Sequence, residues 1–200
     1  MNIPSLKTFE VESRITDFLN RKFEEYQNTF PSGSLLPEDN FKGGYQTGNL
    51  LEWEDKEYSN FRSTYLRDLT VNLFEIDKPF KIQFFYNHML EYGKGSSMGK
   101  HTHIHNEDYV MFIYLNDCND GHTGFYLNDY EPEYKERTAV MVKPTKNTGV
   151  FFHAGIPHEG FPTYENKKIF VMGIRLYFLL KNIRDDKNLE SNFNMTECDI

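Results

Sequence analysis

The sequence lacks the features that mark secreted, membrane-spanning and disulfide-stapled proteins. Only two cysteines, Cys118 and Cys198, occur in 200 residues, with no metal-binding spacing or disulfide framework. We expect both to be free thiols in a reducing compartment. The segment Met1–Ser5 has neither the basic residues nor the apolar stretch of a signal peptide, and no apolar run is long enough to cross a bilayer. The sequence therefore predicts a cytoplasmic protein without a membrane partner.

Basic residues are also scarce. The chain has 22 Lys and Arg against 30 Asp and Glu, which gives a net charge of −8. This balance argues against a general nucleic-acid-binding surface, which needs a positive field. There is one tryptophan, but 18 Phe and 13 Tyr favour sheets and pockets. A chain of this length is expected to form one domain with a substantial core.

The chain divides into a helical part, residues 1–78, a β-core, residues 79–180, and a polar tail, residues 181–200. Apolar residues at helical spacing predict helices over Ser5–Tyr26 and Trp53–Phe74. The segment Phe30–Gly48 between them is rich in proline and glycine. We expect it to be a long loop and a candidate lid.

After Pro79 the sequence turns to short strand-like runs separated by Gly, Asn, Asp and Pro. The glycines between 93 and 99 are expected to break the chain before the histidines that follow. The runs predict a mainly β, α+β domain with a mostly antiparallel barrel or jelly roll. The predicted strands are Lys81–Tyr92, Val110–Leu115, Thr123–Leu127, Thr138–Val142, Val150–His153 and Ile169–Phe178.

Metal-binding side chains fall at every second position of the segment His101–Glu107. On an extended strand His101, His103, His105 and Glu107 would point the same way. Imidazole and carboxylate together suit iron, zinc, copper or nickel. A remote histidine, His158, is a further candidate ligand. Two ligands from one strand and one from another would leave open positions on a metal, as in a 2-His-1-carboxylate iron site.

From Tyr92 to Arg175 the sequence resembles the iron(II)- and 2-oxoglutarate-dependent oxygenases, in particular their prolyl 4-hydroxylase-like branch. The resemblance covers somewhat under half of the chain and depends on five elements in the expected order. They are the tyrosine and glycine turn Tyr92–Gly95 before His101 and His103, the Tyr-Leu-Asn strand Ile113–Asn116, a degenerate Gly-rich element Gly121–Phe125, His158, and the lysines Lys167 and Lys168 about ten residues later.

This resemblance implies a double-stranded β-helix, a jelly-roll or cupin-like core, that binds Fe(II). It also implies 2-oxoglutarate as a small-molecule cosubstrate and O2 as the oxidant. Decarboxylation of 2-oxoglutarate to succinate would accompany hydroxylation of an unidentified peptide or small-molecule substrate. A peptidyl side chain such as proline is the nearest analogy.

One position departs from the family pattern, because residue 103 is histidine where the family has a metal-binding carboxylate. Three ligand sets remain open. The preferred set is His101, His103 and His158. The second is a shifted pair, His105 and Glu107, with His158, and the third, cupin-like set combines His101, His103 and Glu107 with His158.

Lys168 is the predicted anchor for the distal carboxylate of 2-oxoglutarate. It shares parity with the apolar even positions of Ile169–Phe178, which are expected to face the core. A lysine at the edge of an apolar barrel needs an anion or must extend to solvent. In the family a matching tyrosine supports the same carboxylate in some members, which implies this role for Tyr114.

Two other functions remain open. A cupin-type dioxygenase would use the metal without 2-oxoglutarate, and Lys168 would then have no role. A non-catalytic β-sandwich module would use its histidines for a structural metal or for none. Of the remaining histidines, His88 is expected on a strand surface and His122 in a turn. His153 is near enough to His158 in sequence to be a rival distal ligand, but no lysine follows it at the family's spacing.

Overall fold

A curled antiparallel sheet organises the chain. The computed structural model describes residues 5–33, 41–74, 80–104, 107–127 and 139–178. Within these residues the order of paired strands is β1-β7-β4-β9-β3-β8-β5-β6, with β2 added on β3. The strands are β1 Leu6–Glu10, β2 Phe41–Gln46, β3 Phe80–His101, β4 Tyr109–Tyr114, β5 Thr123–Tyr126, β6 Ala139–Val142, β7 Thr148–His153, β8 His158–Gly160 and β9 Lys167–Phe178.

The long strand β3 runs through both parts of the sheet. Its first half pairs with β9 from Phe80 to Tyr92, and its far end pairs with β8 at Met98 and His101. The predicted break at the glycines is therefore wrong. Gly95 has φ +79, a conformation that suits glycine, and its backbone N–H donates to the Thr163 carbonyl, so the strand bends there and continues.

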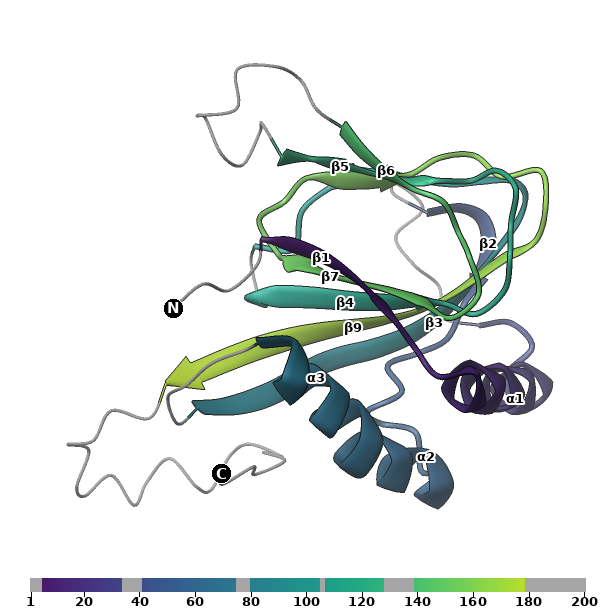
Figure 1. Cartoon of the computed structure of the whole chain (residues 1–200). Coiled ribbons are helices and arrows are strands. Elements are labelled where there is room, and N and C mark those ends of the chain that lie inside the picture. The colour runs from purple at the N-terminus through teal and green to yellow at the C-terminus, as the bar shows by residue number, and fades with distance from the viewer. Residues whose placement is uncertain (1–4, 34–40, 75–79, 105–106, 128–138, 179–200) are drawn as a thin grey trace, which may run out of the picture.

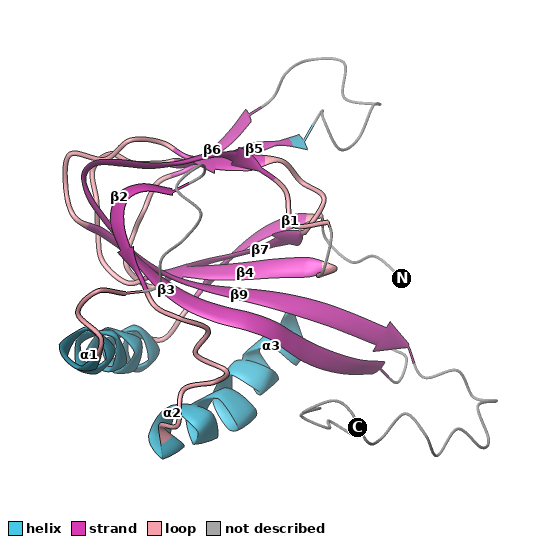
Figure 2. Ribbon diagram, turned by 180° about the vertical axis from the view of Figure 1, so that it is seen from behind, coloured by secondary structure: helices cyan, strands magenta, loops and turns pink. Residues whose placement is uncertain are grey.

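Two layers of strands face each other, and the helices cover only one of them. β1, β7, β4, β9 and the first half of β3 form one layer, and β5 and β6 lie across from it (Figure 1). The helices α1 (Ser13–Thr29), α2 (Lys56–Phe61) and α3 (Arg67–Phe74) lie on the outer face of the first layer (Figure 2). The first layer is consequently buried on both faces, against helices on one side and strands on the other.

The two faces of this layer belong to different apolar cores. Phe170, Met172 and Ile174 of β9 pack with the helices, whereas Ile169 and Val171 face the space between the two layers. Strands buried on both faces carry continuous apolar runs rather than an alternating pattern. On β9, apolar residues therefore do not by themselves show which face a neighbouring lysine shares with the cavity.

The helical predictions are partly confirmed. Trp53–Phe74 forms α2, a π-helical turn η1 (Arg62–Leu66) and α3, and the side chain of Asp55 caps α2 by accepting from the Tyr58 N–H at 2.7 Å. The prediction over Ser5–Tyr26 is wrong at its start. Residues Leu6–Glu10 form β1, which pairs with β7, and the helix begins only at Ser13.

The predicted strands after Pro79 are all present. Most bounds shift by one or two residues, whereas β3 continues nine residues past the predicted end at Tyr92, to His101. The sequence did not indicate β8, which has three residues, or β2, which lies inside the predicted loop Phe30–Gly48. The double-stranded β-helix expected from the resemblance is confirmed by this strand order. Residues 34–40 of the candidate lid and 179–200 of the tail lie outside the described residues.

Among the described residues, no helix is both long and apolar enough to cross a membrane. Cys118 carries a buried free thiol, as expected. Cys198 lies outside the described residues.

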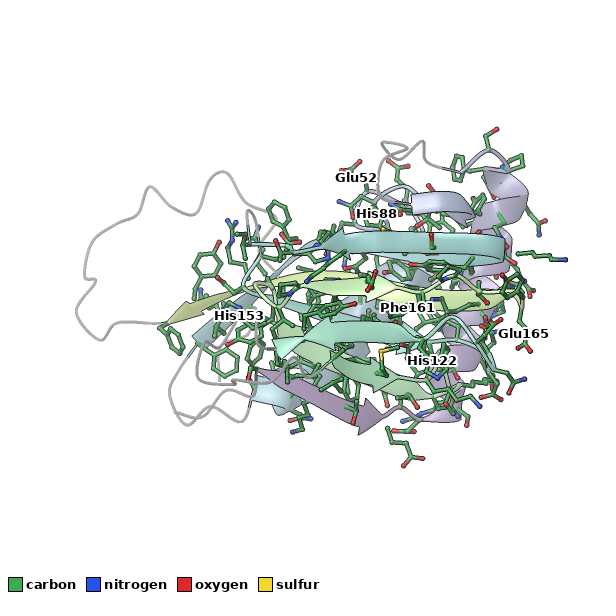
Figure 3. The ribbon with its side chains drawn as sticks, turned by 90° about the horizontal axis from the view of Figure 1, so that it is seen from above. Glu52, His88, His122, His153, Phe161 and Glu165 are labelled. Atoms are coloured by element: carbon green, nitrogen blue, oxygen red, sulfur yellow. The ribbon has the colours of Figure 1, made fainter. Side chains whose placement is uncertain are left out.

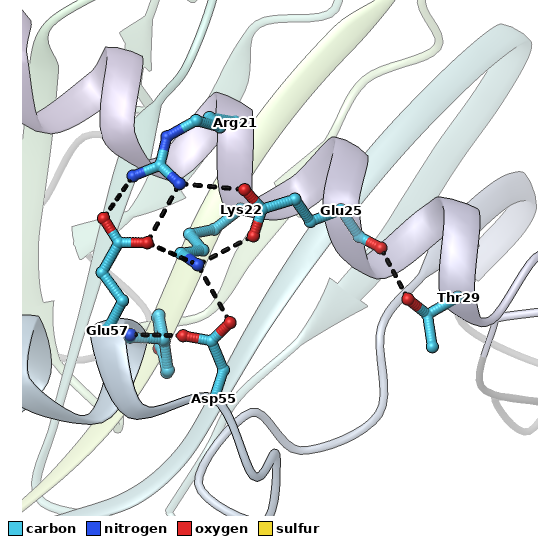
Figure 4. Close-up of polar contacts among 7 residues, drawn as sticks. Arg21, Lys22, Glu25, Thr29, Asp55 and Glu57 are labelled. Carbon is cyan, nitrogen blue, oxygen red and sulfur yellow. Dashed lines mark hydrogen bonds and ion pairs between the residues drawn. The ribbon is translucent and has the colours of Figure 1, made fainter.

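A buried lysine joins α1 to α2. Lys22 is 3% exposed, and its Nζ lies 2.7 Å from Glu25, 2.9 Å from Asp55 and 2.8 Å from Glu57 (Figure 4). Arg21 pairs with Glu25 and Glu57 from the solvent side. The acidic partners raise the pKa of Lys22 against the effect of its burial, so the ammonium stays charged.

Replacing Lys22 should therefore destabilise the contact between these helices. Lys22→Met removes the shared cation and leaves three carboxylates facing one another. We expect the free energy of unfolding to fall by roughly 1.5–3 kcal/mol, the range for a lost hydrogen bond to a charged group. Urea unfolding measures it, with Lys56→Met as the control because Lys56 is exposed. Equal stabilities of the two variants would contradict this role.

Candidate metal centre

Three histidines from two strands and the following loop converge at one end of the space between the layers. One ring nitrogen from each of His101, His103 and His158 lies within 4.8 Å of the others. His101 is the residue paired with His158 across β3 and β8, and the His103 backbone N–H donates to the Ala154 carbonyl at 2.9 Å. Backbone pairing thus fixes the positions from which these imidazoles extend.

Each of the three imidazoles uses its Nδ1 in a hydrogen bond away from the shared point. The Nδ1 of His101 lies 2.7 Å from the Gly99 carbonyl, and that of His158 lies 3.0 Å from the Ile156 carbonyl. The Nδ1 of His103 lies 3.0 Å from Oε1 of Glu107. Because a carbonyl or carboxylate accepts, Nδ1 carries the hydrogen, and the Nε2 lone pair of each ring remains available to a metal.

The surroundings favour neutral imidazoles. Burial, and then the neighbouring His101 and His103, hold the pKa of His158 well below its usual range. Burial also lowers the pKa of His101. Neutral imidazole is the form that binds metal ions, so this cluster is suited to a cation and not to protonation.

Glu107 is not part of the converging group among the described residues. Its carboxylate instead contacts the Nδ1 of His103, on the ring nitrogen that the metal does not need. His105, the other member of the shifted pair, lies outside the described residues. The geometry therefore favours the three-histidine set over the cupin-like set.

A cavity of about 290 Å³ extends from the histidines between the two layers. Strands β3, β4 and β9 supply most of its wall, which is apolar and aromatic apart from the histidines. Its lining residues are Gln46, Tyr86, His88, Leu90, Tyr92, Met98, His101, His103, Val110, Phe112, Thr123, His158, Gly160, Ile169 and Val171.

Lys168 does not face this cavity. Its Nζ lies 5.6 Å from the centre of the Phe23 ring, among the residues between the sheet and the helices. Phe170, Met172 and Ile174, at even positions of β9, are apolar and buried, as expected, but they face the helices. The assignment of Lys168 to the cavity is wrong because both faces of β9 are apolar, so apolar parity alone does not identify the cavity side.

Lys167 lies on the cavity side of β9. It is 1% exposed, its Nζ donates to the Gly121 carbonyl at 2.8 Å, and it lies 4.0 Å from the centre of the Tyr92 ring. A Cβ placed on Gly160, which lines the cavity, would lie 3.6 Å from this Nζ. Burial lowers the pKa of Lys167 to about 8. Among the described residues no carboxylate forms an ion pair with it.

The hydroxyl groups of Tyr92, Tyr114 and Thr123 gather at the end of the cavity beside Lys167. Tyr114 is fully buried, and its hydroxyl donates to Thr123 Oγ1 at 2.8 Å. Thr123 lines the cavity. The Tyr92 hydroxyl would lie 3.5 Å from a Cβ at Gly160, beside the Lys167 ammonium. Tyr114 therefore reaches the cavity through Thr123.

His88, His122 and His153 lie apart from one another (Figure 3), and among the described residues none belongs to the converging group. His88 was expected on a strand surface, but it lines the cavity, and its Nδ1 lies 3.2 Å from both the Thr47 and Gly48 carbonyls. His153 accepts from the Gly155 N–H instead of joining the cluster. The period-two pattern of aromatic and apolar residues from Tyr86 to Tyr92 is the sequence signal that marks the cavity side of β3.

The cluster predicts that metal binding depends on His101 and His158 but not on His153. Either His101→Ala or His158→Ala removes one of three ligands, and we expect each to weaken iron(II) binding by at least about 10–100-fold, the loss typical of an outer-shell partner alone. Anaerobic titration with iron(II) measures this, with His153→Ala as the matched control. Wild-type affinity in both ligand variants would place the metal elsewhere.

No protein-family model and no curated protein matches the sequence. Solved structures of low identity do match the fold. A prolyl hydroxylase from Trichoplax adhaerens, in complex with a hypoxia inducible factor peptide, has 17% identity and TM-score 0.63 over 88% of this chain and 84% of that one. The viral collagen prolyl hydroxylase of Paramecium Bursaria Chlorella virus-1, a 2-oxoglutarate complex, has 17% identity and TM-score 0.56 over 86% and 96%.

A third match is HygX from Streptomyces hygroscopicus, with nickel and 2-oxoglutarate bound. It has 11% identity and TM-score 0.63, over 87% of this chain and 84% of that one. The three matches cover 86–88% of this chain and 84–96% of the matched chains. The chain therefore has the double-stranded β-helix fold of iron(II)- and 2-oxoglutarate-dependent oxygenases.

Proposed function

We propose that the protein is an iron(II)- and 2-oxoglutarate-dependent oxygenase that hydroxylates a peptide or small-molecule substrate. One observation carries this proposal. A single cavity is bounded at one end by three imidazoles with available Nε2 atoms and approached at the other by the buried ammonium of Lys167. The first end suits a metal ion, and the second suits an anion.

The donor set fits iron(II). Three imidazoles on one side of a metal leave open positions, as the 2-His-1-carboxylate arrangement does in non-haem iron oxygenases. His101, His103 and His158 would hold the ion, and the carbonyls behind the Nδ1 atoms of His101 and His158 fix these rings in orientation. With 2-oxoglutarate and O2, the bound iron would supply oxidation of a C–H bond coupled to formation of succinate and CO2.

Lys167 would bind the distal carboxylate of 2-oxoglutarate. Among the described residues the Lys167 ammonium donates to one carbonyl and lies against one ring, and Asp120 acts on it electrostatically without forming an ion pair. An anion in the cavity would complete its hydrogen bonds and its charge compensation. His158 and Gly160 lie on the same face of β8, roughly 7 Å apart along the strand. This separation is comparable to the length of an extended five-carbon dicarboxylate. Tyr92 and Thr123 would add hydroxyl groups, and Tyr114 would hold Thr123 in place.

The chain itself contributes orientation and exclusion of water. The walls formed by Leu90, Val110, Phe112, Ile169 and Val171 are apolar, so that a ligand between metal and lysine displaces water. Gln46 of β2 and His88 of β3 line the cavity and offer polar groups for a substrate. A peptide substrate is suggested by the peptide complex of the Trichoplax relative. The class of substrate and the cytoplasmic location both stay predictions.

A cupin-type dioxygenase without 2-oxoglutarate is the alternative. It would leave the buried Lys167 and its hydroxyl neighbours without a role. A non-catalytic metal module would leave both the cavity and the lysine unused. Binding of 2-oxoglutarate to the metal-loaded protein therefore separates the proposed function from both alternatives.

The proposal predicts different effects for two adjacent lysines. Lys167→Met removes the cation beside the cavity, and a charge-assisted hydrogen bond of about 1.5–3 kcal/mol corresponds to a 10- to 150-fold rise in the 2-oxoglutarate dissociation constant. Lys168→Met is the control because Lys168 faces Phe23. Calorimetry with manganese in place of iron gives both constants. A larger loss in the Lys168 variant would contradict this assignment.

The pKa of Lys167 also predicts a pH dependence. With a pKa of about 8, the ammonium is charged at pH 7 and largely neutral at pH 9. We expect 2-oxoglutarate to bind about tenfold more weakly at pH 9 than at pH 7. Pyruvate, a keto acid without the distal carboxylate, is the matched control and should lack this added loss. The same loss for both ligands would assign the effect to the metal end.

A further inference from the structure

Glu107 is a buried acid beside one metal ligand. It is 8% exposed, and its Oε1 lies 3.0 Å from the Nδ1 of His103. Among the described residues, His103 is the one basic side chain recorded within ion-pair distance of it. A buried carboxylate requires hydrogen bonds and a compensating charge. Among the residues that the structure describes, neither a lysine nor an arginine forms an ion pair with Glu107, and a cation bound to His103 would supply that charge.

Tyr86 completes the surroundings of this carboxylate. Its hydroxyl lies 3.1 Å from the Nδ1 of His103 and also bonds Glu107. The Nδ1 of His103 already donates its hydrogen to Glu107, so the Tyr86 hydroxyl donates to the same carboxylate. The Tyr86 ring packs over Gly173, where a Cβ would lie 2.5 Å from it. A side chain at 173 would displace this ring, so the site requires glycine there.

We propose that Glu107 is a positioning residue that supplies, through His103, the negative charge that this site lacks among its ligands. The inference rests on the proposed function, because three neutral imidazoles replace the two imidazoles and one carboxylate of the usual iron site. The His103 N–H would donate to the carboxylate while Nε2 binds the metal. Such a pair fixes the orientation of the ring and makes its Nε2 a stronger electron-pair donor to the metal.

A double-mutant cycle on metal affinity tests the role without requiring turnover. The variants are Glu107→Gln, His103→Asp and the two together, and the probe is manganese(II) alone. Glu107→Gln should weaken binding by about 10–100-fold when residue 103 is histidine. In the His103→Asp background the charge is on the ligand itself, so the same substitution should change affinity by less than about threefold. The absorption bands of bound cobalt(II) should also shift in Glu107→Gln.

Two further variants keep the test informative. Glu159→Gln is the matched control, because Glu159 follows the ligand His158 but its carboxylate bonds the Tyr126 hydroxyl. Glu107→Met removes the same charge with an apolar side chain, which covers the case in which Glu107→Gln unfolds. Each variant is checked by thermal unfolding before titration.

The outcomes separate the inference from the proposed function. Wild-type affinity in Glu107→Gln and Glu107→Met overturns the role of Glu107 and leaves the metal centre intact. An equal loss in both backgrounds also overturns it, because the effect is then structural and independent of residue 103. A wild-type protein that binds no manganese(II) or iron(II) overturns the proposed function together with this inference.

Discussion

The pairing of β3 with β8 is the constraint on which the site depends. It places His101 opposite His158, and the chain after β3 brings His103 to the same point through its bond to Ala154. β8 has only three residues, so this pairing is held by its neighbours rather than by its own length. The bend of β3 near Gly95 lets one strand contribute to both layers and closes the space that becomes the cavity.

The layer buried on both faces explains how a small chain holds a site of this kind. One face packs on α1 and α3 and provides most of the apolar core, including Phe23, Phe74 and Phe170. The other face is free to line a cavity with residues whose spacing is set by the sheet. A register shift between Phe84 and Tyr86 changes which side chains of β3 face the helices and which face the cavity. The same shift gives Tyr86 its place beside His103.

Features that depend on local sequence patterns were predicted, whereas features that depend on tertiary contacts were not. The alternation of His101 and His103, the remote His158 and the strands after Pro79 are readable because they depend on period and turn residues. The sequence does not decide between Lys167 and Lys168 as the cavity residue, because both faces of β9 are apolar. Only the tertiary structure shows which face packs on the helices. β1 and β8 were missed because they are short and acquire their conformation from β7, β3 and β5. The role of Glu107 depends on its contact with the Nδ1 of His103, which the alternation of side chains along a strand does not predict.

The proposed function requires that a metal ion at the three histidines and the buried Lys167 bind the same ligand in one cavity. The most direct measurement is formation of succinate from 2-oxoglutarate by the wild-type protein, reconstituted with iron(II) and exposed to O2 in the presence of ascorbate. We expect succinate in amounts that depend on iron(II) and on 2-oxoglutarate, with a slow uncoupled rate when no substrate is present. A protein that binds one iron(II) tightly but neither binds 2-oxoglutarate nor forms succinate would contradict it.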